Sequence, residues 1–311
     1  MELQGIHHIT CICADAARNV DFYARVLGLR LVKKTVNFDQ PEAYHLYYGD
    51  ERGSPGSLLT FFEFRDAAPG RAGAGMIHRL QWRVASDEAL GFWDERLGAE
   101  GIALDHDGHA SALAFSDPEG LRLELVVQEG GDPPLTAAMP GIPEEHALLG
   151  FHGVRAYVPY PEQTESVMTE VLGFEEVAEG SYRVTGGGRH AIYVYDAAPE
   201  AHGLLGAGTV HHIAWATTDE DQEQWRRTLA DAGANVTPII DRQYFQSIYF
   251  REPRGVLFEI ATLSPGFAID EDPDALGEEL KLPPQHEHLR DHLERTLVAV
   301  TNPRAGSRPR A

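Results

Sequence analysis

The chain repeats one short pattern of structure four times, and this repetition constrains its fold more than any other feature. The clearest match sets DPEGLRLEL at 117–125 against EPRGVLFEI at 252–260, a tight turn before an alternating strand at a constant offset of 135 residues. Upstream of each turn, a strand precedes a helix-like amphipathic stretch and further short strands. The same order recurs twice more, so the sequence predicts an α+β fold of four βαβββ units. These units span roughly 5–65, 76–128, 150–198 and 209–263.

A segment rich in proline and glycine separates the second unit from the third. The stretch EGGDPPLTAAMPGIPEEHALL at 129–149 is typical of a linker. We therefore expect an N-terminal domain of two units at 1–128 and a C-terminal domain of two units at 150–263. The tail at 264–311 is acidic at first, contains a predicted amphipathic helix in HEHLRDHLERTLVAV, and ends in a frayed TNPRAGSRPRA.

The charge balance argues against several classes of partner. The 311 residues carry a net charge of -22 and only three lysines, whereas nucleic acids and anionic membranes attract clustered basic residues. No apolar run approaches the roughly 20 residues of a membrane span, and the N-terminus does not resemble a secretory signal. We therefore expect a cytoplasmic protein that binds neither nucleic acid nor membrane. Cys11 and Cys13 alternate on one strand and are expected to be two buried thiols.

Two histidine pairs open equivalent strands of the first and fourth units. The motifs GIHHIT and TVHHIAW each place their second histidine, His8 or His212, seven residues before an acid. Because side chains alternate across a strand, these two share a face of their modules, while His7 and His211 point to the other face. Glu259 in GVLFEIAT stands where strand residues should be apolar, and a metal would offset the cost of burying it. Two imidazoles and one carboxylate form the facial triad expected for non-haem Fe(II) enzymes.

A glyoxalase-type site would need a second carboxylate ligand from the first unit. Aligning the turns of the first and fourth units places Thr60 at the position of Glu259, and Glu63 has the opposite parity. The first unit therefore lacks that ligand.

The remaining histidines offer weaker alternatives. The second unit keeps an acid, Glu124, but has Ile77 at the offset position of His212, with His78 one residue out of register. His152, which opens the third unit, is an alternative to His8 as a ligand. The tail histidines fit a solvated helical face better than a metal site; they are His286, His288 and His292.

Taken together, the motifs GIHHIT, YHLYYGD, GFHGV, HHIAW and GVLFEIAT resemble the vicinal oxygen chelate superfamily, which includes glyoxalases, bleomycin resistance proteins and extradiol dioxygenases. Within it, they are similar to the hydroquinone ring-cleaving dioxygenases, the chlorohydroquinone and MhqO-like group. The resemblance covers about residues 5–263 and implies paired βαβββ units that form two open barrels around one metal. It implies that the ligands of Fe(II), or alternatively Mn(II), are His8, His212 and Glu259.

The resemblance also points to five residues around this centre, which are His7, Thr10, His211, Arg242 and Tyr249. Arg242 would hold developing negative charge, and Tyr249 would form a hydrogen bond with a ring oxygen. Since their parity turns His7 and His211 away from the metal, they would orient ligands or shuttle protons.

These features favour an extradiol-type dioxygenase that inserts O2 into a hydroquinone- or catechol-like aromatic diol. One alternative is a glyoxalase-like isomerase or lyase that consumes no O2. Another is a drug-binding protein of the same superfamily, which would not need the three metal ligands. The open barrel edges are compatible with a homodimer.

Overall fold

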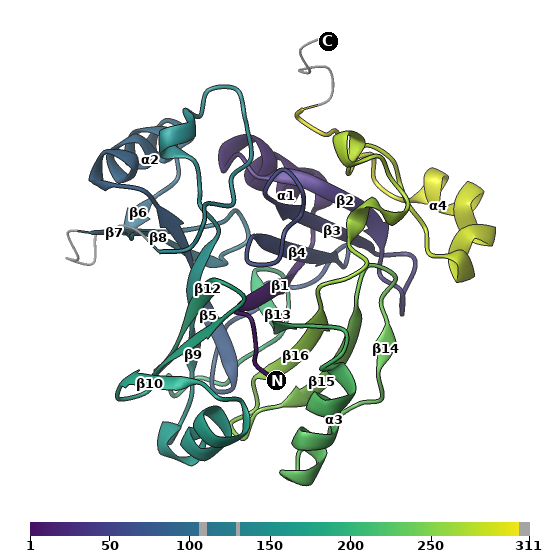
Figure 1. Cartoon of the computed structure of the whole chain (residues 1–311). Helices are drawn as coiled ribbons and strands as arrows, with labels where there is room; N and C mark the ends of the chain where they lie inside the picture. Colours follow the sequence, from purple (N-terminus) through teal and green to yellow (C-terminus); the bar gives the residue numbers. More distant parts are fainter. Residues whose placement is uncertain (106–110, 129–130, 305–311) are drawn as a thin grey trace.

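Two eight-stranded sheets, one of them curled into a half-barrel, form the protein. The structure is a computed structural model that describes residues 1–105, 111–128 and 131–304. Figure 1 shows β1 (Ile6–Cys13) and β13 (Thr209–Thr217) at the centre, with the second sheet beside them. The predicted α+β class and the four βαβββ units are confirmed.

Each unit supplies four strands and at least one helical segment. Unit 1 contains β1, α1 (Ala16–Val20), the π-helical η1 (Asp21–Val26), β2 (Arg30–Val36), β3 (Tyr44–Gly49) and β4 (Leu58–Glu63). Unit 2 contains β5 (Met76–Val84), α2 (Asp87–Ala99), β6 (Leu104–Asp105), β7 (Ala112–Ser116) and β8 (Arg122–Val127). Unit 3 contains β9 (Phe151–Tyr157), η3 (Pro161–Gln163), η4 (Val167–Val171), β10 (Glu175–Ala178), β11 (Ser181–Gly186) and β12 (Arg189–Asp196). Unit 4 contains β13, α3 (Gln222–Asp231), β14 (Ile240–Asp241), β15 (Gln246–Arg251) and β16 (Leu257–Thr262).

The units pair through the open edges of their first strands. One sheet has the order β14-β15-β16-β13-β1-β4-β3-β2 and so joins units 4 and 1, whereas the other joins units 3 and 2 in the order β10-β11-β12-β9-β5-β8-β7-β6. The predicted division into 1–128 and 150–263 therefore does not describe how the units pair. Its linker, which contains η2 (Glu144–His146), connects two strands of the same sheet. The chain instead crosses between sheets near 69–71 and 204–207, where the two crossovers lie side by side.

The repeated turn motif has a physical explanation. Asp117 accepts hydrogen bonds from the backbone N–H groups of Glu119 and Leu121, at 2.9 and 2.8 Å. In the fourth unit Glu252 accepts from the backbone N–H of Val256 at 2.8 Å. The glycine of each motif has a positive φ, which a side chain would disfavour. The acid and the glycine thus fix the same turn before β8 and β16.

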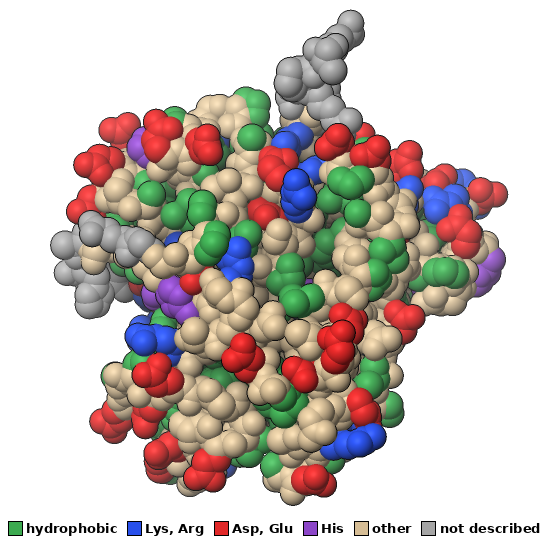
Figure 2. Space-filling view, viewed as in Figure 1, with side chains coloured by type: hydrophobic (Ala, Val, Ile, Leu, Met, Phe, Trp, Pro, Cys, Tyr) green, Lys and Arg blue, Asp and Glu red, His purple; other side chains and the backbone are tan. Residues whose placement is uncertain are grey.

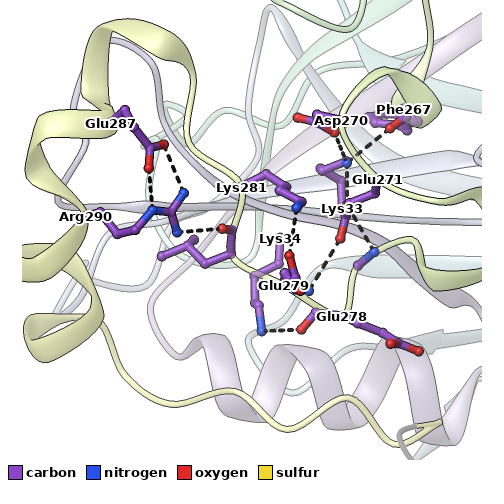
Figure 3. Close-up of polar contacts among 12 residues, drawn as sticks. Lys33, Lys34, Phe267, Asp270, Glu271, Glu278, Glu279, Lys281, Glu287 and Arg290 are labelled. Atoms are coloured by element: carbon purple, nitrogen blue, oxygen red, sulfur yellow. Dashed lines mark hydrogen bonds and ion pairs between the residues drawn. The ribbon is translucent and has the colours of Figure 1, made fainter.

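The tail packs along β2 at the edge of the first sheet, as Figure 1 shows in yellow. Lys33 is fully buried and its ammonium contacts Asp270, Glu271 and the carbonyl of Phe267 (Figure 3). The tail contains η5 (Phe267–Ile269), η6 (Pro273–Ala275), η7 (Pro284–Leu289) and α4 (Arg290–Thr296). The predicted tail helix is therefore present, whereas the end of the predicted frayed segment, 305–311, lies outside the described residues. The tail covers backbone groups of an edge strand that would otherwise be open to pairing.

The surface and the two cysteines agree with the composition. Figure 2 shows acidic side chains spread over one face, with fewer basic ones among them. No helix within the described ranges is long and apolar enough to cross a membrane. Cys11 and Cys13 are buried free thiols, as expected.

Candidate metal centre

Three neighbouring strands of the first sheet bring the predicted ligands together. In the ladder, His8 on β1 lies opposite Ala214 on β13, and Ala214 lies beside Glu259 on β16. The Nε2 atoms of His8 and His212 are 3.4 Å apart, and they lie 3.3 and 2.9 Å from Oε2 of Glu259. Ligands about 2.1 Å from an ion at right angles to one another would be about 3.0 Å apart. The three atoms therefore have the spacing of one face of an octahedron.

The chemistry of these atoms fits a divalent cation. All three side chains are buried, and Oε2 of Glu259 has no hydrogen-bond partner of good geometry among the described residues. Its other oxygen, Oε1, accepts a hydrogen bond from Ser247. Burial opposes ionisation of Glu259, but the attraction of His8 and His212 outweighs it and holds the pKa well below its usual range. A metal would satisfy the unpaired carboxylate oxygen and both imidazole nitrogens.

The other member of each histidine pair sits in a β-bulge. Ile6 pairs with Trp215 and His8 with Ala214, so His7 is an extra residue on β1. In the same way His211 is an extra residue on β13. Each bulge brings the extra ring beside a ligand, and His211 also lines the cavity, whereas His7 lies behind His8 and does not.

The contact with His7 suits the tautomer of His8 that a metal would require. A free Nε2 lone pair on His8 requires the proton on Nδ1, which then donates to Nδ1 of His7 at 2.9 Å. His7 in turn donates from Nε2 to the carbonyl of Thr262 at 3.1 Å. Burial, and next the neighbouring His8, lower the pKa of His7 to about 3, which keeps this ring a neutral acceptor. With a metal bound, these two hydrogen bonds would hold the His8 ring in place.

The fourth unit repeats the contact between the two rings. Nδ1 of His211 lies 2.8 Å from Nδ1 of His212. Burial and then His212 lower the pKa of His211 to about 4. His211 differs from His7 in its surroundings, since it lines the substrate-sized cavity described next.

A cavity of about 350 Å³ is lined by two of the three ligands, His8 and His212. Its walls combine aromatic side chains, among them Phe38, Phe62 and Phe245, with polar groups that include histidines, threonines and Arg242. A volume of this order, with apolar walls and a few convergent polar groups, is typical of a small-molecule site. An aromatic ring would fit between these side chains beside the metal centre.

Comparison with known proteins agrees with this geometry. The family model of the Glyoxalase/Bleomycin resistance protein/Dioxygenase superfamily matches residues 5–125 and 150–260. The chain belongs to this superfamily. It is 41% identical to the "Putative ring-cleaving dioxygenase MhqA" of Bacillus subtilis, over 96% of this chain and 100% of that protein. It is 35% identical to the chlorohydroquinone/hydroquinone 1,2-dioxygenase of Sphingobium indicum, over 95% of this chain and 96% of that protein. A crystal structure of a "putative dioxygenase" from Bacillus subtilis has a TM-score of 0.90 and 40% identity, covering 97% of this chain and 98% of the other.

In this member of the superfamily, Arg242 and Tyr249 lie on the cavity wall. Tyr249 stands beside Glu259 in the ladder, and its hydroxyl accepts a hydrogen bond from Nε of Arg242 at 3.1 Å. Arg242 also contacts Asp39 at 3.1 Å. Burial, and next the charge of Glu259, raise the pKa of Tyr249, so its hydroxyl stays protonated and available as a donor. Thr10 lines the same cavity, next to His212 in the ladder.

The two weaker ligand alternatives lie in the other sheet. His152 places its Nδ1 2.9 Å from the side-chain oxygen of Gln128, so it does not replace His8. In the second unit Gln81 is beside Glu124, as Ala214 is beside Glu259, and this register puts Arg79 at the place of His212. The fixed offset of 135 residues predicts Ile77 at the position of His212. This is wrong by two residues, because the connection between β5 and β8 is two residues shorter than that between β13 and β16. The Arg79 guanidinium lies 2.9 Å from Glu124, so an ion pair stands where the fourth unit has a histidine beside its carboxylate.

Sequence reasoning missed several polar residues of the cavity, among them His45 and Tyr47. Both occur in YHLYYGD, which the sequence identified only as a strand. Their two-residue spacing puts them on one face of β3, and this spacing was the available signal. The tail histidines do not join the centre: His286 contacts the carbonyl of Phe38 at 2.8 Å, and His288 and His292 are exposed.

Proposed function

We propose that this protein is a metal-dependent, ring-cleaving dioxygenase of the extradiol type that acts on a hydroquinone- or catechol-like aromatic diol. The observation that carries the proposal is the octahedral face formed by His8, His212 and Glu259 at the end of an aromatic cavity. The names of the relatives, a ring-cleaving dioxygenase and a chlorohydroquinone/hydroquinone 1,2-dioxygenase, support the ring-cleaving dioxygenase part of the proposal. Fe(II) is the proposed metal, with Mn(II) as the alternative, because two imidazoles and a carboxylate suit either ion.

The three protein ligands leave about three positions of an octahedron open, enough for a diol oxygen and O2 together. When bound, the metal would supply Lewis acidity and a common template for these two reactants. The protein's own residues do the rest. Phe38, Phe62 and Phe245 would hold the ring in the cavity and exclude water from it.

Arg242 and Tyr249 would act on the substrate oxygen. Arg242 is fixed by Asp39 and hydrogen-bonded to Tyr249, so its positive charge is held beside the cavity before substrate arrives. A charge that is already in place stabilises negative charge on oxygen without reorganisation during the reaction. Tyr249 would donate its hydroxyl proton in a hydrogen bond to that oxygen. These roles explain why a loop arginine and a strand tyrosine converge here.

The two rival functions make different demands on the site. A glyoxalase-like isomerase would need a second carboxylate, and the ladder puts Thr60 at that place, since Thr60 is beside Thr10 as Glu259 is beside Ala214. A binding protein without chemistry would not need the ligand set. A cytoplasmic location and a homodimer remain part of the proposal.

Oxygen uptake tests the proposal. The protein would be reconstituted anaerobically with Fe(II), and O2 consumption and the ring absorbance would be followed after adding hydroquinone, methylhydroquinone and catechol in turn. We expect one O2 consumed for each ring lost, and no uptake by the Glu259→Ala variant. Tight metal binding without uptake would favour the isomerase, and an absence of metal binding would favour the binding protein.

A further inference from the structure

Four side chains form a continuous hydrogen-bonded chain along the cavity wall opposite Glu259. The hydroxyl of Tyr47 lies 2.8 Å from Nδ1 of His45, and Nε2 of His45 lies 3.0 Å from the hydroxyl of Thr60. Thr60 donates to the hydroxyl of Thr10 at 2.9 Å. Tyr47, His45 and Thr10 line the cavity, while Thr60 is fully buried behind them. The chain therefore begins and ends at the cavity and passes through its wall.

This hydrogen-bonded chain lies in the first unit, at positions equivalent to those of Glu259 and its neighbours in the fourth unit. A pseudo-twofold axis runs between β1 and β13, because His8 pairs with Ala214 as Thr10 pairs with His212. The axis relates Thr60 to Glu259, which have equivalent neighbours in the ladder.

The same axis relates the next strand outward. Tyr47 pairs with Thr60 as Tyr249 pairs with Glu259, and the residue two positions before each tyrosine is His45 or Ser247. Ser247 holds the Glu259 carboxylate, and His45 correspondingly holds the Thr60 hydroxyl. One half of the barrel thus presents a metal ligand, and the other half presents neutral groups that can exchange protons.

The chain has a direction. Thr60 uses its only hydroxyl proton toward Thr10, so it accepts from Nε2–H of His45. Nδ1 of His45 then has no proton and accepts from the hydroxyl of Tyr47. Burial and then the neighbouring His8 hold the pKa of His45 well below its usual range, which keeps the ring neutral. Every proton therefore points from Tyr47 toward Thr10, and the lone pairs of Tyr47 are left for a donor in the cavity.

We propose that Tyr47 binds the substrate's second hydroxyl, the one remote from the metal, and that His45, Thr60 and Thr10 relay its proton to the oxygen side of the site. This inference rests on the proposed function. Thr10 neighbours His212 in the ladder, so the exit of the chain lies near the ligands, whereas Tyr47 lies two strands further along the same row. The substrate ring would then lie in the cavity between Tyr47 and the two histidine ligands, which all line it.

The transfer balances. The remote hydroxyl gives its proton to the oxygen of Tyr47, whose own proton passes to Nδ1 of His45. His45 releases its Nε2 proton to Thr60, Thr60 releases one to Thr10, and Thr10 releases one to an oxygen atom that comes from O2. The ring carbons lose the electrons that O2 gains, and no net proton enters or leaves. Through the relay, the remote oxygen would lose its proton as it donates electrons to the ring, and the oxygen atom that comes from O2 would gain a proton.

Binding measurements test the entrance of the relay without requiring turnover. The probes are hydroquinone and 4-methoxyphenol, which lacks the second hydroxyl proton, titrated anaerobically into the Fe(II)-loaded protein while its fluorescence is recorded. We expect wild type to bind hydroquinone roughly 3- to 10-fold more tightly, the worth of one hydrogen bond. The Tyr47→Phe variant should lose this preference. A wild type without the preference would overturn the proposal.

Thr60→Val tests the relay itself, because valine has the shape of threonine without its hydroxyl. We expect kcat for hydroquinone to fall about 100-fold, with the dissociation constant for hydroquinone unchanged. Thr60→Ser should restore the rate. Thr35→Val is the matched control, since Thr35 is equally buried in the same sheet and its hydroxyl makes no hydrogen bond to the described residues.

The outcomes separate the two proposals. A wild type that turns over hydroquinone and a folded Thr60→Val that is equally fast would overturn the relay alone. A wild type that binds hydroquinone with the expected preference but consumes no O2 would overturn the proposed function and the transfer step with it.

Discussion

Replacing His7 by phenylalanine should weaken metal binding although His7 is not itself a ligand. In the metal-bound state Nε2 of His8 must be unprotonated, so its Nδ1 carries a proton that His7 accepts, at 2.9 Å. Phenylalanine would keep the ring packed against Phe245, whose centroid is 4.9 Å away, but it would remove this acceptor. The His8 ring is buried, so its N–H would be left without a partner.

The expected loss of metal affinity can be estimated from the free energy that the substitution adds to the metal-bound state. An unpaired buried N–H costs about 1–3 kcal/mol. The metal-free protein avoids this cost, because His8 can instead carry its proton on Nε2, which lies 3.3 Å from the Glu259 carboxylate. The penalty therefore falls on the metal-bound state alone and corresponds to a loss of roughly 5- to 150-fold in metal affinity. Losses of about 10- to 100-fold are usual when a group that orients a ligand is removed.

Competition with a chelator of known affinity, under anaerobic conditions, would measure the Kd of Fe(II) and of Mn(II). His7→Gln should retain part of the affinity, because its side-chain oxygen is again an acceptor. His146→Phe is a matched control, since that ring stacks on Phe92 and its Nδ1 has no hydrogen-bond partner in the part of the chain that the structure describes. An unchanged Kd in His7→Phe would refute the assigned tautomer and the orienting role.

Three further predictions concern catalysis, stability and pH. Tyr249→Phe should lower kcat about 10- to 100-fold and leave the metal Kd unchanged, which steady-state kinetics and chelator competition would check; a loss of metal affinity would contradict the role of Tyr249 toward substrate. Lys33→Met should lower the free energy of unfolding in urea by about 3–5 kcal/mol, because it leaves the buried Glu271 without its cation. Lys34→Met is the control: the Lys34 ammonium donates to the backbone carbonyl of Glu278 at 3.3 Å, so its loss should cost about 1 kcal/mol, and equal losses in the two variants would argue against a buried ion pair. Burial raises the pKa of Glu252, so the native state keeps its proton to higher pH than the unfolded chain does, and stability should fall as pH rises from about 4.3 through the raised pKa. Glu252→Gln should remove that slope, and a slope that persists in urea titrations across this range would assign it to other groups.

Much of the site was predictable because the repeats align the chain with itself. The offset between repeats identified Thr60 as the counterpart of Glu259, and the ladder gives the same correspondence. The same method failed for the second unit, where Arg79 and not Ile77 stands at the place of His212. A fixed offset assumes connections of equal length, and the connection between β5 and β8 is two residues shorter than that between β13 and β16.

The alternation of side chains along a strand also did not predict how the two histidine pairs are arranged. Alternation separates neighbouring residues in a regular strand, but the bulges add an extra residue at His7 and at His211, and each of these rings contacts the ligand ring beside it. A bulge depends on the register of two strands about two hundred residues apart, which a single strand's sequence does not encode.

The sequence by itself determined the four βαβββ units, their turns and the residue types at the metal centre, because these depend on local alternation and on short-range hydrogen bonds such as those of Asp117. Only the tertiary structure decided that unit 1 pairs with unit 4, since every unit offers a similar open strand edge and local patterns do not choose among them. That choice places His8 beside His212 and Glu259 and sets Tyr47 and His45 on the opposite wall of the same cavity.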